Sequence, residues 1–142
     1  MADLVADLAW TRQWIGLPFR DRARGPDAFD CWGLLWAVLR EEFGVEIPSY
    51  AEVSGETANR DQVRELFSKP EEVERWKEVP AGQEQPGDGI LIRMRGQPWH
   101  VAVVAGEGLM LHVIVGANTC LESYRSSKWR RRILGFYRWR GA

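Results

Sequence analysis

Hydrophobic residues recur every three or four positions through the first half of the chain, a spacing typical of amphipathic helices. The helices that this spacing predicts cover residues 3–15, about 31–43, about 60–67 and 70–76. Gly44 follows the second of them as a C-terminal stop, and either Asp27 or Asp30 is placed to cap its first turn. Asn59 is the expected N-cap of the third, after a loop over residues 45–58.

From Asp88 onward the hydrophobic positions alternate instead, as they do in β-strands. The predicted strands cover residues 89–94, 99–105, 109–115, 119–124 and 133–140, with glycine-containing turns at 96–98, 106–108 and 116–118. Helices first and an antiparallel meander second predict an α+β fold with the helices on one face of the sheet. The length of 142 residues fits a single domain over residues 1–142.

Composition excludes several classes of protein. The chain has 19 Lys and Arg against 20 Asp and Glu, a net charge of −1, so no overall basic field points to nucleic acid. No apolar run approaches the ~20 residues of a membrane span, and the acidic N-terminal residues predict that there is no export signal. Two cysteines are too few for a disulfide scaffold, and Cys31 and Cys120 lack the paired spacing of a structural zinc site.

The small net charge hides an uneven distribution. Residues 125–140 contain seven basic residues and no acidic one, so the last twenty residues carry +7 and the rest of the chain −8. One interpretation is a solvated edge strand whose charges oppose edge-to-edge association. The other is a docking surface for an acidic partner or an anionic polymer, because Trp129 and Trp139 lie among the basic residues.

Three residues are candidates for nucleophilic catalysis. Cys31 falls in the first turn of a predicted helix, where backbone N–H groups and the helix dipole favour a thiolate. The only two histidines, His100 and His112, lie twelve residues apart on either side of the turn at 106–108. In a hairpin they come to lie roughly opposite each other, so that one imidazole can orient the other. Taken singly, each also fits a structural role, as a buried thiol or a sheet histidine.

Four segments, in this order, resemble the NlpC/P60 cysteine peptidases, which are cell-wall hydrolases with a papain-like fold. They are Asp30–Leu34, Gln85–Leu91, His100–Val103 and Leu111–Val113. With residues 41–50, the Asp-Cys-Trp-Gly-Leu variant is more similar to the branch found in the tails of phages and of phage-like gene transfer agents. The resemblance covers most of the chain, and it implies N-terminal helices packed on a five- to six-stranded antiparallel sheet.

The resemblance assigns catalytic roles residue by residue. Cys31 is expected to be the nucleophile, with its own backbone N–H as one oxyanion donor. His100 is expected to be the general base and later the acid that protonates the leaving amine, and His112 is expected to orient it. The reaction that this implies needs no metal and no organic cofactor.

Substrate contacts are expected from Asp30, Trp32 and Trp99, which flank the catalytic residues. Asp30 also fits a helix cap, and both tryptophans also fit core packing. Phe19 stands where many members of the family have a tyrosine thought to assist the oxyanion. Loss of one oxyanion donor typically costs about 10²–10³ in rate, so either backbone donors suffice here or the activity is reduced.

The resemblance implies a peptidase that cuts peptidoglycan stem peptides through a thioester, usually at the bond between D-glutamate and diaminopimelate. The expected partners are peptidoglycan and other tail or tail-hub proteins, with no nucleic acid and no membrane span. The protein is expected to be made in the cytoplasm without a signal peptide, to join a phage-like tail particle, and to act at the cell wall or periplasm. The alternatives are a weak or inactive structural tail-tip component or adaptor, and a Cys–His amidase or acyltransferase.

Overall fold

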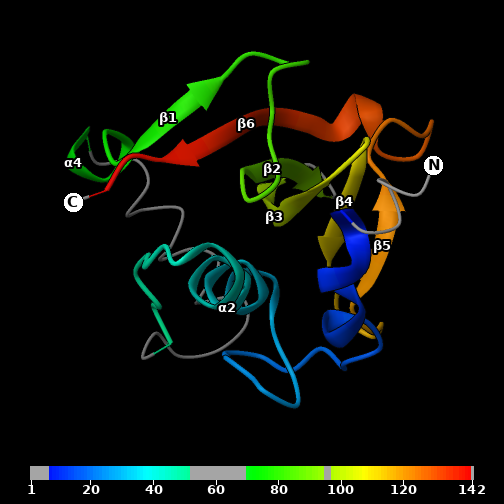
Figure 1. Cartoon of the computed structure of the whole chain (residues 1–142). Coiled ribbons are helices and arrows are strands. Elements are labelled where there is room, and N and C mark those ends of the chain that lie inside the picture. The colour runs from blue at the N-terminus through cyan, green and yellow to red at the C-terminus, as the bar shows by residue number, and fades with distance from the viewer. Residues whose placement is uncertain (1–6, 52–69, 95–96, 142) are drawn as a thin grey trace.

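The computed structural model describes residues 7–51, 70–94 and 97–141, and for residues 72, 73 and 97–99 it describes the backbone alone. The helices are the 3₁₀ helix η1 (Ala9–Trp14), α2 (Cys31–Phe43), α4 (Pro70–Val73) and the 3₁₀ helix η2 (Arg130–Arg132). The strands are β1 (Trp76–Val79), β2 (Gly89–Met94), β3 (Gln97–Gly106), β4 (Leu109–His112), β5 (Cys120–Ser123) and β6 (Ile133–Trp139). The fold is α+β, as the change of hydrophobic period predicts (Figure 1).

The strands form one six-stranded antiparallel sheet in the order β1-β6-β2-β3-β4-β5. β2 to β5 follow one another as the predicted meander, but β6 returns to lie between β1 and β2. In Figure 1, β1 and β6 cross the top of the molecule while β4 and β5 run down its right side. The sheet is therefore strongly twisted, as expected from the right-handed twist of β-strands.

The strand β1 was not predicted from the sequence. The helix expected over residues 70–76 ends at Val73, and Trp76 instead begins β1. Trp76 pairs with Trp139 at the end of β6, and the two rings meet edge to face with centroids 5.1 Å apart. Because its partner strand is distant in the sequence, local periodicity carries no signal for this pairing.

The other differences from prediction are smaller. The N-terminal helix is 3₁₀ from Ala9 to Trp14 rather than α-helical throughout, and the start of the expected helix at residue 3 lies outside the described residues. The expected helix over residues 60–67, with its N-cap Asn59, also lies outside them. β4 ends at His112 rather than at residue 115, ahead of a turn closed by the Ala117 N–H on the Ile114 carbonyl.

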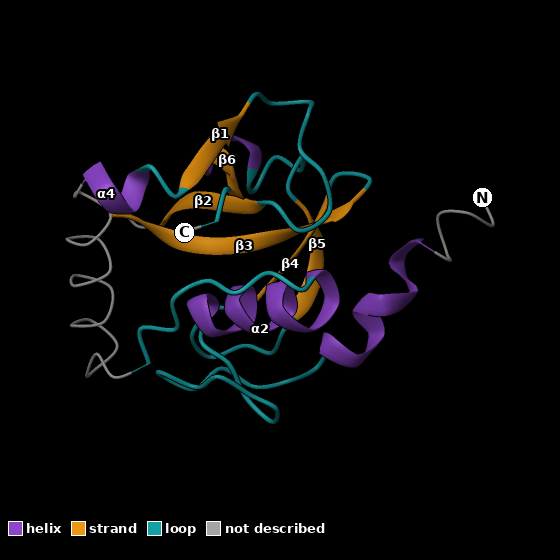
Figure 2. Ribbon diagram, turned by 60° about the vertical axis from the view of Figure 1, so that its left-hand side comes forward, coloured by secondary structure: helices purple, strands orange, loops and turns teal. Residues whose placement is uncertain are grey.

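Helix α2 covers one face of the sheet (Figure 2). It packs against β3 and β4, and its apolar side meets Val101, Val103 and Leu111 in what we call the α2-face core. Gly44 ends the helix in the left-handed conformation with φ 65°, which confirms the predicted stop. None of the helices in the described part of the chain has the length and apolar character to cross a bilayer.

The strand residues that alternate with this set face the other side of the sheet. Ala102, Val104 and Met110 pack there with Phe136 and Trp129 in a second core. The segment after β5 supplies part of this core, because Trp129 is only 1% exposed. Both faces of the central strands are therefore buried, and side chains on either face are shielded from water.

The basic C-terminal segment contributes to packing. Its two interleaved tryptophans are not a free aromatic surface, since Trp129 is buried and Trp139 packs on Trp76. Arg138 forms two hydrogen bonds of 2.8 Å to the buried carboxylate of Asp88. The docking interpretation of this segment therefore loses its aromatic argument.

Candidate active site

A hydrogen-bonded cap holds the N-terminal end of α2. Oδ1 of Asp30 accepts the backbone N–H of Gly33 at 2.6 Å and a guanidinium N–H of Arg24 at 2.8 Å. Oδ2 of Asp30 accepts the backbone N–H of Arg22 at 3.0 Å. Asp30 rather than Asp27 is therefore the cap, and the cap alternative for this residue is confirmed. A contact of Asp30 with substrate stays a prediction.

Gly33 allows the preceding loop to lie directly on the first turn of α2. A Cβ at this position would stand 2.1 Å from the carbonyl oxygen of Ala23. Cys31 is the first residue of the helix, is partly exposed, and packs at the margin of the α2-face core. The thiol therefore lies at the positive end of the helix dipole, where a negative charge is stabilised.

The two histidines meet as predicted. Nε2 of His100, in β3, lies 2.9 Å from Nδ1 of His112, at the end of β4, and the ring centroids are 5.1 Å apart. His100 is 4% exposed and His112 only 1%, so the pair is shielded from water. Their strands are the ones on which α2 packs, with Cys31 at its N-terminal end.

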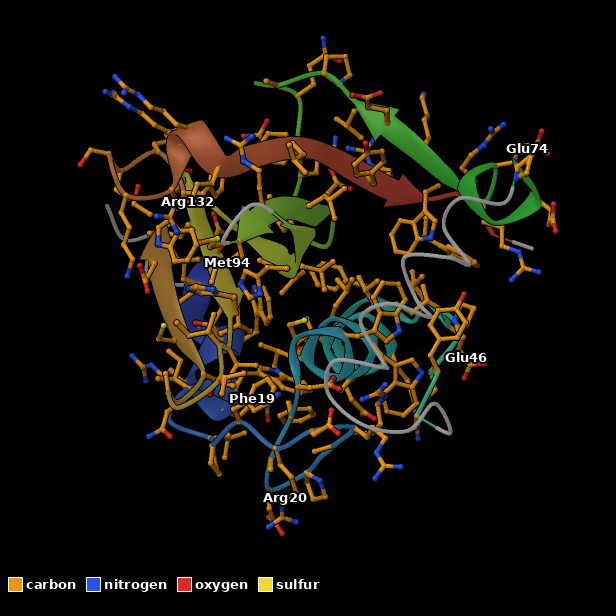
Figure 3. The ribbon with its side chains drawn as sticks, turned by 180° about the vertical axis from the view of Figure 1, so that it is seen from behind. Phe19, Arg20, Glu46, Glu74, Met94 and Arg132 are labelled. Atoms are coloured by element: carbon orange, nitrogen blue, oxygen red, sulfur yellow. The ribbon has the colours of Figure 1, made fainter. Side chains whose placement is uncertain are left out.

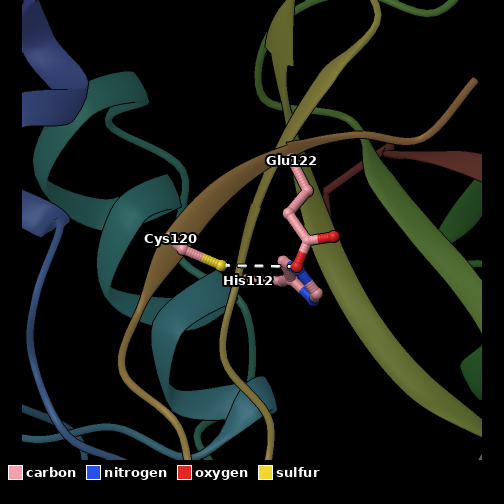
Figure 4. Close-up of side chains that lie close together, drawn as sticks. All are labelled: His112, Cys120 and Glu122. Carbon is pink, nitrogen blue, oxygen red and sulfur yellow. Dashed lines mark hydrogen bonds and ion pairs between the residues drawn. The ribbon is translucent and has the colours of Figure 1, made fainter. Parts of the chain in front are cut away.

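A carboxylate and an indole complete the histidine cluster. Oε1 of Glu122 lies 3.3 Å from Nε2 of His112 (Figure 4), and Oε2 of Glu122 accepts the indole N–H of Trp129 at 2.6 Å. The Trp129 ring stacks on His100 at 6.1 Å and meets His112 edge to face at 5.1 Å. One continuous chain of polar contacts thus runs from His100 through His112 and Glu122 to Trp129.

The partners determine which imidazole nitrogens carry protons. Burial lowers the pKa of His112, and the nearby Glu122 offsets this only in part, so His112 is neutral near pH 7. Burial raises the pKa of Glu122, but the Trp129 hydrogen bond and the interaction with His112 outweigh it and lower the pKa overall. Because an ionised carboxylate only accepts, His112 donates from Nε2 and accepts at Nδ1 from His100. Neutral His100 then has its lone pair on Nδ1, as a general base requires.

Sequence reasoning missed Glu122 and Trp129. Cys120 and Glu122 are two residues apart in a predicted strand, so they lie on the same face of the sheet. Cys120 pairs with His112, and this register could have placed Glu122 near the histidines. Trp129 lies in the turn before η2 and gives no periodic signal. Only the return of the chain after β5 brings its ring onto the two imidazoles.

The remaining predicted residues have other contacts, or their side chains lie outside the described residues. Trp32 is 5% exposed, donates to the Pro48 carbonyl at 2.7 Å and packs on Tyr50, as the core alternative expects. Phe19 packs at the margin of the α2-face core (Figure 3). The side chain of Trp99 lies outside the described residues. Substrate contacts of both tryptophans therefore stay predictions.

Comparison with known proteins identifies the family to which this chain belongs. The model of the NlpC/P60 family matches residues 16–138. The chain is 24% identical over 119 residues to the murein DD-endopeptidase MepS/murein LD-carboxypeptidase of Escherichia coli, covering 84% of this chain and 54% of that protein. The chain thus spans about half the length of the curated relatives that it matches.

Solved structures agree with this assignment. An NlpC/P60 family protein from Bacillus cereus superposes with a TM-score of 0.66 at 21% identity, covering 95% of this chain and 40% of that one. The NlpC/P60 domain of the peptidoglycan hydrolase SagA superposes with a TM-score of 0.54 at 22% identity, covering 87% and 89% of the two chains. The chain belongs to the NlpC/P60 family and has its fold, and this is a family of cysteine peptidases.

Proposed function

We propose that the protein is a cysteine endopeptidase that cuts the stem peptides of bacterial peptidoglycan, with Cys31 as nucleophile, His100 as general base and His112 as the residue that orients His100. The observation that carries the proposal is the buried His100–His112 pair on the strands against which α2 packs. The hydrogen-bond chain leaves Nδ1 of His100 as the acceptor, and the helix places a thiol at its N-terminus.

The proposed reaction has two halves. In the first, His100 accepts the thiol proton, Cys31 sulfur attacks the peptide carbonyl, and the tetrahedral intermediate collapses to a thioester as His100 protonates the departing amine. In the second, His100 removes a proton from water, the resulting hydroxide attacks the thioester, and the Cys31 thiol is regenerated with release of the carboxylic acid. His112 keeps the His100 ring oriented throughout, because its Nδ1 accepts the hydrogen bond from the Nε2–H of His100.

The names of the relatives support peptidoglycan as the substrate. The matched Escherichia coli protein is a murein endopeptidase and carboxypeptidase, and SagA is a peptidoglycan hydrolase. Both act on the peptide-bearing polymer of the cell wall. Since the chain covers only part of the first of these proteins, murein cleavage by this chain is a proposal that calls for a direct test.

The decisive experiment incubates the purified protein and its Cys31→Ala variant with sacculi and muropeptides under reducing conditions. New amine termini, detected by labelling and mass spectrometry, are expected with the wild type and at background level with Cys31→Ala. The same spectra identify the bond, and they distinguish peptide cleavage from amidase or transferase products. The matched control is Cys120→Ser, which removes the other cysteine. Release that depends on Cys120 and not on Cys31 would contradict the assignment of the nucleophile.

We further propose that the enzyme works as a component of a phage-like tail and reaches the cell wall with that particle. The support is the similarity of the Asp30–Leu34 motif and residues 41–50 to the tail-associated branch. The test is quantitative mass spectrometry of density-purified particles from a strain that encodes the protein, with a deletion strain as control. Co-purification at a constant ratio to other tail proteins is expected, and absence from intact particles would contradict this part of the proposal.

A further inference from the structure

A second set of chemistry-bearing side chains adjoins the proposed catalytic cluster. Cys120 lies directly opposite His112 in the register of β4 and β5, and Glu122 follows two residues later on the same face. A ring nitrogen of His112, Sγ of Cys120 and a carboxylate oxygen of Glu122 all lie within 4.8 Å of one another (Figure 4). An imidazole, a thiol and a carboxylate are the three ligand types that zinc takes in proteins.

We propose that His112, Cys120 and Glu122 form a binding site for a thiophilic divalent cation such as Zn²⁺, and that occupation of this site switches off the general base His100. The ligand distances support the first half. Tetrahedral ligands at ordinary zinc distances lie about 3.3–3.6 Å from one another. Oε1 of Glu122 lies 3.3 Å from Nε2 of His112 and 3.6 Å from Sγ of Cys120.

The site is anchored on one side and open on the other. His112 is 1% exposed, and Trp129 holds Glu122 by its second oxygen, an outer contact of the kind that orients metal ligands. Cys120 and Glu122 are partly exposed, so an ion can enter from solvent and keep a water as fourth ligand. The gap between Cys120 and His112 closes by rotation of the Cys120 side chain.

Binding has a defined proton balance. A thiol is protonated near pH 7 in the absence of a metal, so Cys120 releases one proton to solvent as its sulfur bonds the metal. Nε2 of His112 loses its proton to solvent and bonds the metal, and Nδ1 of His112 takes a proton from Nε2 of His100. Nδ1 of His100 takes a proton from solvent. Both imidazoles remain neutral, and the net change is one proton released for one ion bound.

This rearrangement reverses the hydrogen bond between the histidines. In the metal-free protein His100 donates from Nε2 to His112, so the lone pair of neutral His100 lies on Nδ1. In the metal-bound protein His112 donates from Nδ1 to His100, so the proton of His100 lies on Nδ1. A base that already carries this proton cannot accept another from a thiol without losing the His112 hydrogen bond. This inhibitory half of the inference rests on the proposed role of His100, whereas the binding half does not.

The binding half is tested in the Cys31→Ser variant, in which Cys120 is the sole thiol. Calorimetry with Zn²⁺ is expected to give one ion per chain, and Co²⁺ is expected to give a thiolate-to-cobalt charge-transfer band. Adding Cys120→Ser should remove the band and weaken Zn²⁺ binding by more than the ~10–100-fold typical of outer-contact losses. Glu122→Gln should also weaken binding, whereas Glu84→Gln, a carboxylate bonded to Tyr124 instead, should not. No cobalt–thiolate band, or equal affinity after Cys120→Ser, overturns the site.

The inhibitory half is tested by alkylation of Cys31 with iodoacetamide, followed by peptide mass spectrometry, so that no hydrolysis is needed. Saturating Zn²⁺ is expected to slow alkylation of Cys31 by about tenfold or more in the wild type, reversibly with a chelator. In Cys120→Ser, compared with its own zinc-free rate, Zn²⁺ should have no effect. Equal slowing in both proteins means that Zn²⁺ acts directly at Cys31 and overturns the switch. Absence of murein cleavage contradicts the proposed function instead and leaves these readouts intact.

Discussion

At the N-terminal end of α2 one side chain, Asp30, binds backbone N–H groups, whereas the histidine cluster is held by contacts between side chains. Asp30 caps backbone N–H groups of Gly33 and Arg22, and the Ala23 carbonyl lies against Gly33. His100 and His112 instead touch through their rings, and Glu122 contacts the second of them. The first arrangement is local in sequence, and the second joins three strands.

The two regions control different properties of the site: the position of the thiol and the protonation state of the base. The Asp30 cap and the Ala23 carbonyl determine where the Cys31 thiol lies, because they order the first turn of the helix. The hydrogen bonds between side chains determine which nitrogen of His100 carries a proton. Glu122 accepts, so His112 donates to it and must accept from His100. Changes in the first region should therefore affect stability first, and changes in the second should affect chemistry first.

The largest effect is expected from His100→Ala, which removes the base and leaves the α2 cap untouched. The rate of muropeptide cleavage should fall by about 10²–10⁴-fold, the usual contribution of general acid–base catalysis. The measurement is kcat/KM on a defined muropeptide, with circular dichroism as the control for folding. A variant that keeps its wild-type rate would remove His100 from the mechanism.

Glu122→Gln is expected to damage chemistry while preserving shape. The glutamine has one acceptor oxygen where Glu122 uses two, so either Trp129 loses its partner or His112 meets an N–H group and changes tautomer. The cleavage rate should fall about 10–100-fold, as for other residues that orient a functional ligand. Glu84→Gln is the matched control, because Glu84 accepts from Tyr124 but touches neither histidine. Equal loss in both variants would contradict a specific role for Glu122.

Gly33→Ala is expected to act on the other region, through stability. The new Cβ meets the Ala23 carbonyl at 2.1 Å, so the loop must move, at a cost of about 1–3 kcal/mol in the free energy of unfolding. Urea unfolding followed by tryptophan fluorescence measures it. Gly89→Ala is the control, since its Cβ meets nothing closer than 3.8 Å. Comparable losses at both positions would show that the close approach at Gly33 carries no special strain.

The smallest effect is expected from Tyr124→Phe, which tests a carboxylate outside the site. Burial raises the pKa of Glu84, but the Tyr124 hydroxyl and the Gly82 N–H outweigh it and lower the pKa overall. Ionised Glu84 therefore stabilises the fold above about pH 4.5, and this contribution is lost as the pH falls through the lowered value. Tyr124→Phe should cost about 0.5–1.5 kcal/mol at pH 7. Between pH 7 and pH 3, the denaturant midpoint of Tyr124→Phe should decline less than that of the wild type.

Local patterns in the sequence determined most of what lies close together along the chain. The stop at Gly44 follows from the chemistry of helix ends, which also limited the cap to Asp27 or Asp30. The turn between β3 and β4 places His100 near His112, because a hairpin brings its two strands side by side. The ordered motifs around Cys31 and the two histidines carried the family, which the match over residues 16–138 confirmed.

Only the tertiary structure decided how distant segments meet. β1 forms because Trp76 pairs with Trp139 of the distant strand β6. Trp129 contacts both imidazoles because the chain returns to them after β5. The joining of Glu122 to the histidine pair likewise depends on the β4–β5 register and on burial, which together set the charge of each group. Periodicity reports which face a residue occupies, but the partner on that face comes from elsewhere in the chain. Local sequence motifs therefore identify the catalytic candidates, whereas the tertiary contacts determine their protonation states.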